Sequence, residues 1–498
     1  MNFEDIFDDD YFDDSFGEFE NFLELENKIK KYHYAMRRKN RPNDYKDENE
    51  LPTADMIEQL VEYCISSQKF DEALDFCNLW IEYYPASLEA KNSFTYILIC
   101  LSRFNEAIIS ADKVLETYEN DTEALLHKAM SFEGIGEPET SIELLEKILE
   151  IEPDNEIAKG LIALAYKNRG NFDEAIEYFE QLIQAFPDEP ENYAHLAACY
   201  NDLQDFEQAI SYCKTAIDLS PYSEDFWYNL GATYANQKNY DDAIEAFMMT
   251  LAIDEQYFPA LTAIAKAYFD SGNNIKSAEF FRQALILKPN DSETLTDYST
   301  VLADSGDFIQ AINHLQMAVK NSPLTVNNQS HRAFFGLGIC YCAINNEKKA
   351  LEHFDKALTV KPNHKDTLSI KADILFSLGR FVEAIKVFEI LQSLDKKNLM
   401  YLFSLGKCFY MLQDYDNATY CFMQMFSSTG IKEGEIELFS RSFYWLAKIE
   451  IKKENFDRAA AFLLQAFDLD DERRLDYLLE FPALLEKKYT KFNRKLKK

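Results

Sequence analysis

Short side chains that can accept hydrogen bonds recur through the middle of this 498-residue sequence at intervals of 34 residues. The five positions are Asn168, Asp202, Asn236, Asp270 and Asp304. Their amide and carboxylate oxygens could accept hydrogen bonds from the N–H groups of an extended peptide, or pair with Lys and Arg side chains. The alternative is that they are turn residues, because Asn and Asp are favoured where a helix gives way to a turn. The sequence leaves both interpretations open.

Residue types that commonly carry catalysis show no comparable spacing. The seven histidines form no HExxH motif, and the sequence has no glycine-rich phosphate loop, GxSxG elbow or CxxC pair. The nine cysteines are scattered, and Cys340 and Cys342 form a lone CxC. We therefore predict core thiols in a reducing compartment, no catalytic residues, no metal site and no cofactor. An unrecognised enzyme, or an accessory subunit of one, is the alternative.

The composition excludes several classes of protein. Aspartate and glutamate number 86 against 51 lysines and arginines, which gives a net charge of −35. Such a chain repels phosphate backbones and anionic lipids, so we expect no nucleic-acid partner and no membrane partner. With only 14 glycines and 13 prolines, the chain is not collagen-like or mostly disordered. The sequence has no bilayer-spanning apolar stretch and no basic, apolar leader after Met1, so we expect a cytoplasmic location.

A small residue recurs along most of the chain at steps of 34 residues, with one step of 39 and one of 41. There are twelve such anchors, of which two are serines, Ser141 and Ser277. An aromatic residue stands three positions before the anchor in nine of the twelve units, and proline stands twelve positions after it in seven. We expect the ten alanine anchors to pack between helices; they are Ala73, Ala107, Ala175, Ala209, Ala243, Ala311, Ala350, Ala384, Ala418 and Ala459.

The unit over residues 156–189 shows what each repeat encodes. Apolar residues at helical spacing predict one amphipathic helix over 157–165 and a second over 175–183. Gly170 breaks the first helix, and Pro187 ends the second because proline cannot continue the hydrogen-bond ladder. A single helix pair cannot bury its apolar faces alone, so neighbouring pairs must stack on one another.

This pattern resembles the tetratricopeptide repeat family, whose repeats follow W-x2-L-G-x2-Y…A-x3-F…P. The best match has glutamate at position 255 in place of the final proline, and its motif residues are Trp227, Leu230, Gly231, Tyr234, Ala243 and Phe247. The resemblance implies an all-α, right-handed superhelical solenoid of antiparallel helix pairs. We count twelve repeats over residues 54–473. The resemblance further implies that the first helix of each pair lines a concave groove that binds a peptide or protein segment.

Groove positions of the first helices are often acidic. Glu191 and Asp225 stand 18 residues before their anchors, and we add them and Tyr228 to the groove candidates. The alternative is a helix-start effect, because acids stabilise the N-terminus of a helix. Acids occupy this position in seven of twelve repeats, at Asp55, Glu89, Glu123, Glu191, Asp225, Glu293 and Asp366.

Some family members grip acidic chaperone tails through Lys, Asn and Arg at two further groove positions. These positions here carry no such clamp, since they hold Ala194, Tyr228 and Thr262 in one case and Ala198, Ala232 and Lys266 in the other. We therefore expect a basic or mixed-charge ligand whose binding weakens as salt rises.

The two ends of the chain differ from the repeats. Residues 1–26 hold eleven acidic residues, six phenylalanines and no Lys or Arg, whereas residues 28–41 hold seven basic residues and no acid. The extension 1–53 is predicted to be a disordered tail, a docking segment or a packed helix. Residues 474–498 are predicted to form a capping helix with a basic tail. One hypothesis is that residues 1–26 fold onto the basic residues 487–498 or occupy the superhelix.

These observations predict a non-catalytic scaffold or adaptor that binds a protein or peptide partner in an acidic groove. A self-associating structural protein, and hence a homo-oligomer, is the alternative. Inserts near residues 324–330 and 430–437 are expected to lengthen loops between repeats.

Overall fold

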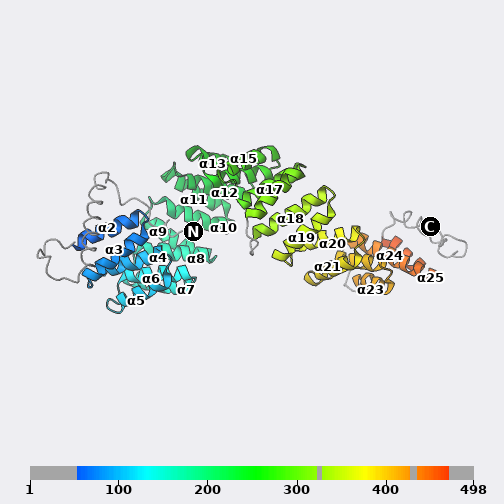
Figure 1. The fold of residues 1–498 in the computed structure, drawn as a ribbon, viewed down its shortest axis with the longest axis horizontal. Coiled ribbons are helices and arrows are strands. Elements are labelled where there is room, and N and C mark those ends of the chain that lie inside the picture. Colours follow the sequence, from blue (N-terminus) through cyan, green and yellow to red (C-terminus); the bar gives the residue numbers. More distant parts are fainter. Residues whose placement is uncertain (1–52, 322–327, 427–434, 470–498) are drawn as a thin grey trace, which may run out of the picture. The chain divides into compact units, whose positions relative to one another are not determined.

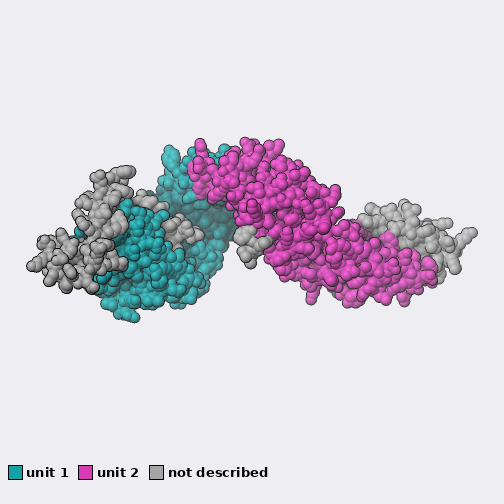
Figure 2. All heavy atoms as spheres, in the orientation of Figure 1, with its two compact units in different colours: residues 1–253 teal, residues 254–498 magenta. Residues whose placement is uncertain are grey.

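The computed structural model describes residues 53–321, 328–426 and 435–469, which form 24 helices and no strand (Figure 1). They belong to two compact units, residues 1–253 and 254–498 (Figure 2). The first helices of the pairs are α2 (Ala54–Ser66), α4 (Leu88–Cys100), α6 (Thr122–Ile135), α8 (Glu156–Asn168), α10 (Pro190–Asp202), α12 (Glu224–Asn236), α14 (Phe258–Asp270), α16 (Ser292–Asp304), α18 (Asn328–Ala343), α20 (Lys365–Ser377), α22 (Leu399–Met411) and α24 (Ile436–Lys452). The second helices are α3 (Phe70–Tyr83), α5 (Phe104–Leu115), α7 (Pro138–Ile151), α9 (Phe172–Ala185), α11 (Phe206–Leu219), α13 (Tyr240–Ile253), α15 (Asn274–Leu287), α17 (Phe308–Asn321), α19 (Glu347–Val360), α21 (Phe381–Leu394), α23 (Tyr415–Met425) and α25 (Phe456–Leu469).

The all-α solenoid of helix pairs predicted from the sequence is confirmed in each unit, and the 24 helices fit the expected twelve repeats. The extension 1–53 lies outside the described residues apart from Thr53, as does the predicted cap 474–498. Most of each predicted insert also lies outside them. The first helices that follow the inserts, α18 and α24, have 16 and 17 residues, against 13 in α8.

Helix starts and turns follow from local chemistry. Ser87 and Asp121 cap α4 and α6, because their side-chain oxygens accept hydrogen bonds from the N–H groups of Ala90 and Ala124 at 3.0 and 2.8 Å. The turn between the helices of each pair contains one residue with positive φ, always five positions before the anchor. Five of these residues are glycines, which adopt this conformation without strain; the other seven are Gln68, Ser102, Gln204, Lys238, Asn345, Gln413 and Glu454.

The core of each repeat is a contact between small and large side chains. All ten anchor alanines have no exposed surface. Four residues further along the second helix, a phenylalanine is often fully buried, as at Phe179, Phe281 and Phe354. The anchor's small size lets the two helices approach closely, and the ring then fills the space between them.

The first helices lie on the inner side of each stack. The first helices of several neighbouring repeats contact each other, as α4 does α6 and α22 does α24. Within the described residues, the second helices of neighbouring repeats have slight contact at most. The stack therefore curves toward its first helices, and we call the side that they line the inner face. No described helix has the length and apolar character needed to cross a bilayer.

Candidate functional site

The five residues of the predicted polar ladder each end a first helix, at the C-terminus of α8, α10, α12, α14 and α16, and all five are exposed. Two of them bond to a neighbouring element. Asn236 donates from Nδ2 to Oδ1 of Asn201 at 3.1 Å, and Asp304 accepts at Oδ2 from Nδ2 of Asn274 at 2.6 Å. Asn168, Asp202 and Asp270 end their helices in the same way. The ladder residues therefore sit directly before the turns, where they link neighbouring helices or face solvent.

The three further groove candidates lie in α10 and α12 of the first unit. Glu191 and Asp225 are exposed in the first turns of these helices. Tyr228 is half-buried, and its ring centroid lies 5.4 Å from that of Phe247. Tyr228 therefore contributes to packing within its repeat, whereas the two acids leave their carboxylates at the inner face.

A denser group of acids lies on the first three repeats. We call Asp55, Glu58 and Glu62 of α2, Glu89 of α4 and Glu123 of α6 the acidic face. Burial, and then the charges of Glu62, Glu89 and Asp55, raise the pKa of Glu58. Asp55, Glu58 and Glu62 form no ion pair with any cation in the described part of the chain. Like charges are therefore crowded around Glu58, and no cation of the described residues pairs with the three acids of α2.

Glu58 and Glu62 were not among the residues predicted from the sequence. The signal was present, because they stand 15 and 11 residues before Ala73. In some family members those two positions carry a basic clamp, whereas here they are acidic. The crowding of charge at Glu58 depends partly on Glu89, which belongs to the neighbouring repeat and comes close to Glu58 only when the repeats stack.

Two buried polar atoms at the edge of the acidic face have no hydrogen-bond partner among the described residues. Asn92 of α4 donates from Nδ2 to Glu123 at 2.8 Å and to Asp121 at 3.1 Å, which fixes the orientation of its amide. Its Oδ1 is buried and accepts no bond, and Nδ1 of His127 on α6 likewise has no partner among the described residues. Asn92 is 1% exposed and His127 6%. The Oδ1 atom of Asn92 is therefore an acceptor beside the acidic face that lacks a donor.

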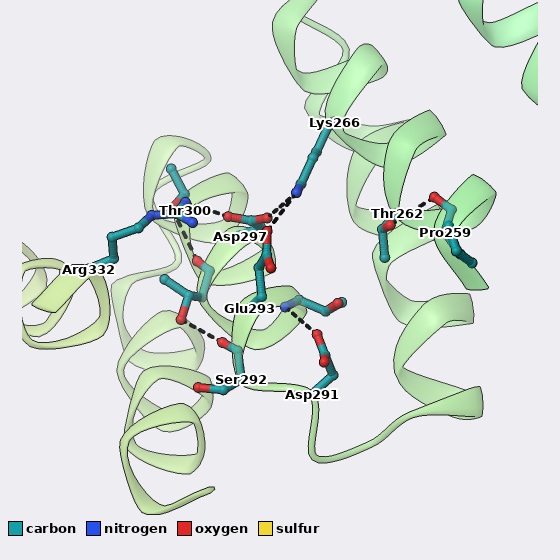
Figure 3. A network of polar contacts seen from close by, with 11 residues as sticks. Pro259, Thr262, Lys266, Asp291, Ser292, Glu293, Asp297, Thr300 and Arg332 are labelled. Carbon is teal, nitrogen blue, oxygen red and sulfur yellow. Dashed lines mark hydrogen bonds and ion pairs between the residues drawn. The ribbon is translucent and has the colours of Figure 1, made fainter. Parts of the chain in front are cut away.

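In the second unit, two acids of the inner face are paired with cations. Figure 3 shows Asp297 of α16 between Lys266 of α14 and Arg332 of α18, with oxygen–nitrogen distances of 3.0 and 2.5 Å. Lys266 also reaches Glu293 at 3.1 Å. Burial by itself would lower the pKa of Lys266. The charges and hydrogen bonds of Asp297 and Glu293 have the larger combined effect, so the pKa of Lys266 is raised. This network joins three successive first helices and neutralises their charge.

The last three repeats present cations and rings instead. Lys407 of α22 lies 4.6 Å from the ring centroid of Phe376 and 5.8 Å from that of Phe403, and Arg441 lies 5.1 Å from Phe403. Burial and the charge of Arg441 lower the pKa of Lys407. Cations therefore accompany acids on the described first helices of the second unit, whereas Asp55, Glu58 and Glu62 of α2 pair with none in the described residues.

Titratable residues elsewhere pack in the core. Burial lowers the pKa of His127 and of His195 to about 4, so both rings are neutral near pH 7. Burial raises the pKa of Cys77 and Cys408 to about 12, so both remain thiols. Across the described ranges, no three His, Cys, Asp or Glu side chains are grouped as metal ligands.

Comparison with known proteins gives the following matches. Models described as "Tetratricopeptide repeat" match residues 123–155, 258–291 and 440–473. The model "Anaphase-promoting complex, cyclosome, subunit 3" matches residues 168–250 and 343–425. No curated protein matches the chain.

Several solved structures are similar to parts of the chain at low sequence identity. YrrB, described as a TPR protein with an unusual peptide-binding site, is 21% identical over 39% of this chain and 97% of its own, with a TM-score of 0.33. MamA is 24% identical over 32% of this chain and 94% of its own, with a TM-score of 0.30. A tetratricopeptide repeat protein from Parabacteroides merdae is 19% identical over 51% of this chain and 98% of its own, with a TM-score of 0.41.

Proposed function

We propose, because this chain belongs to the tetratricopeptide repeat family of protein-interaction scaffolds, that it is a non-catalytic adaptor that binds a basic or mixed-charge polypeptide segment on the inner face of its first unit. The acidic face supplies the main contacts. Asn168, Asp202, Asn236, Glu191 and Asp225 extend the polar surface along the later repeats of the same unit. The polypeptide's Lys and Arg side chains pair with the carboxylates.

The observation that carries this proposal is the crowding of acids around Glu58, whose pKa is raised by burial and by three neighbouring carboxylates. A ligand cation between these groups replaces mutual repulsion with attraction. Because the side chains are half-buried or exposed, each pair contributes only about 0.2–1 kcal/mol, and affinity depends on several pairs acting together. Salt screens such pairs, so binding falls as ionic strength rises.

The test is a binding titration with a labelled peptide that alternates lysine and serine, the lysine–serine probe. Glu58→Gln combined with Glu62→Gln weakens binding roughly threefold to tenfold at low salt. The matched control is Glu143→Gln with Glu150→Gln, which removes equal charge from exposed positions of the second helix α7. Equal loss in both double variants, or affinity that does not change with salt, contradicts the proposal.

Self-association is a second candidate, favoured by the outer side of α15 and α17. Ile275 is 83% exposed, Ile286 77% and Ile309 68%. Asp173 and Asp241 occupy the position equivalent to Ile275 and Ile309 in two earlier repeats. Exposed apolar side chains at such positions favour contact between copies. Light scattering at two concentrations detects an increase in mass, and Ile275→Asp with Ile309→Asp abolishes the increase if this surface causes it.

The remaining expectations stand as predictions. So acidic a chain is expected to bind neither nucleic acid nor membranes, and a cytoplasmic location remains a prediction from the sequence alone.

A further inference from the structure

The acidic face has a complementary segment within the same chain. Residues 28–41 hold seven basic residues and no acid, and they precede α2, which carries three of the five acids of the face. By charge alone, the acidic face would attract any basic peptide. The position of this segment in the chain distinguishes it from other basic peptides.

Distance allows the contact. The twelve residues between Arg41 and Ala54 extend at most about 40 Å, at roughly 3.3–3.6 Å per residue. Helix α2 is about 20 Å long at 1.5 Å per residue, and neighbouring helices are spaced about 10 Å apart. A segment tethered to the start of α2 can therefore reach α2, α4 and α6. Such a short tether keeps the segment at a high local concentration.

The unpartnered Oδ1 of Asn92 gives independent support for a ligand that carries N–H groups. Oδ1 of Asn92 cannot be exchanged with Nδ2, because Nδ2 is held by two carboxylates. Leaving this Oδ1 atom buried without a donor costs free energy. A polypeptide that crosses the α4–α6 boundary supplies the missing donor from its main chain or from Lys and Arg.

We propose that residues 28–41 of this chain occupy the acidic face and that an external basic ligand must displace them. This inference rests on the proposed function, since it assigns regulation to the same face. Residues 1–26 are a poor occupant, because their eleven acidic residues would add to the crowding around Glu58. The other basic stretch, residues 487–498, belongs to the second unit.

The test compares two full-length variants with equal charge change. One replaces the seven basic residues of 28–41 with glutamine, and the other replaces the seven of 487–498. The first binds the lysine–serine probe at least about tenfold more tightly than the natural chain, because the competing segment no longer binds. The second binds it unchanged. Equal affinity in all three chains, or an equal gain in both variants, overturns the proposal.

Crosslinking separates this proposal from the proposed function. A carbodiimide couples a carboxylate to a lysine amine in direct contact, so lysines of residues 28–41 should couple to Glu58 and Glu62 in the natural full-length chain. Glu143 and Glu150, exposed on α7, are the internal controls. Coupling only to residues 1–26 or to α7 overturns the inference, whatever the probe does. If the coupling is as expected but no chain binds the probe, the inference stands and the external basic ligand of the proposed function is wrong.

Discussion

Gly231 and Phe247 pack so closely that a Cβ atom on Gly231 would lie 2.6 Å from the phenylalanine ring. The same relationship joins Gly406 to Phe422, where the distance would be 2.7 Å. In both pairs the glycine belongs to the first helix and the ring to the second, 16 residues later. This contact gives a physical reason for the small residue found twelve positions before most anchors and the large one found four positions after many of them.

Gly231→Ala should lower the free energy of unfolding by about 1–3 kcal/mol, because the new methyl group forces the Phe247 ring to move within a packed core. Urea unfolding followed by circular dichroism measures the change. Other repeats accept alanine at this position, as Ala163 does beside Phe179, so the ring can be accommodated at moderate cost.

The control for that change is Gly160→Ala in the middle of α8, where nothing lies within 4 Å of the added Cβ. This variant should gain roughly 0.5–1 kcal/mol, since glycine loses more backbone entropy than alanine on forming a helix. If Gly160→Ala lowered the free energy of unfolding as much as Gly231→Ala does, the steric explanation would be wrong.

Ser277→Ala should stabilise the protein by about 1 kcal/mol. Ser277 is an anchor with no exposed surface, and no described residue bonds to its hydroxyl. Alanine removes the unsatisfied group and restores the residue found at ten of the twelve anchors. The reverse change, Ala311→Ser, should destabilise by about 1–3 kcal/mol in the same unfolding assay. A stabilised Ala311→Ser variant would refute this account of the anchors.

Asp297→Asn should destabilise the second unit by about 1–3 kcal/mol, because the Asp297 side chain is 9% exposed and lies between Lys266 and Arg332. Glu293→Gln should cost less than about 1 kcal/mol, since the Glu293 side chain is 45% exposed. A double-mutant cycle of Asp297→Asn with Lys266→Met measures the coupling, expected at about 0.5–3 kcal/mol. Strict additivity would show that the network does not stabilise the stack.

His127 should make stability depend on pH. Its folded pKa of about 4 lies below the ordinary value of 6.5, so between these values the unfolded chain binds more protons than the folded one. Stability contributed by His127 is therefore full above about pH 6.5 and falls, by up to about 1.4 kcal/mol per pH unit, as pH drops to about 4. Asp121 acts in the opposite direction by raising the pKa.

The measurement compares urea midpoints of the natural chain and His127→Leu at a series of pH values. The difference between the two curves should change below pH 6.5 and level off near pH 4. Carboxylates elsewhere affect both chains alike, so parallel curves across this range would refute the prediction.

The candidate site was predicted in part from the sequence. The family resemblance and the repeat spacing predicted Glu191 and Asp225 as groove positions, and the structure leaves both exposed in the first turns of their helices. The sequence could not predict the crowding of charge at Glu58, because Glu89 belongs to the next repeat. The distance between Glu58 and Glu89 depends on how the repeats stack. The pairing of Asp297 also escaped prediction, since its partners lie 31 and 35 residues away in the chain.

The order of helices and turns is local information, and the sequence by itself determined it. Periodicity, capping residues and breakers act within a few residues, and the same pattern repeats along the chain. How the charged residues of each inner face pair was decided by the tertiary structure. Electrostatic energy depends on distance through space, so whether a carboxylate faces another acid, as Glu58 does, or two cations, as Asp297 does, is fixed only when neighbouring repeats pack.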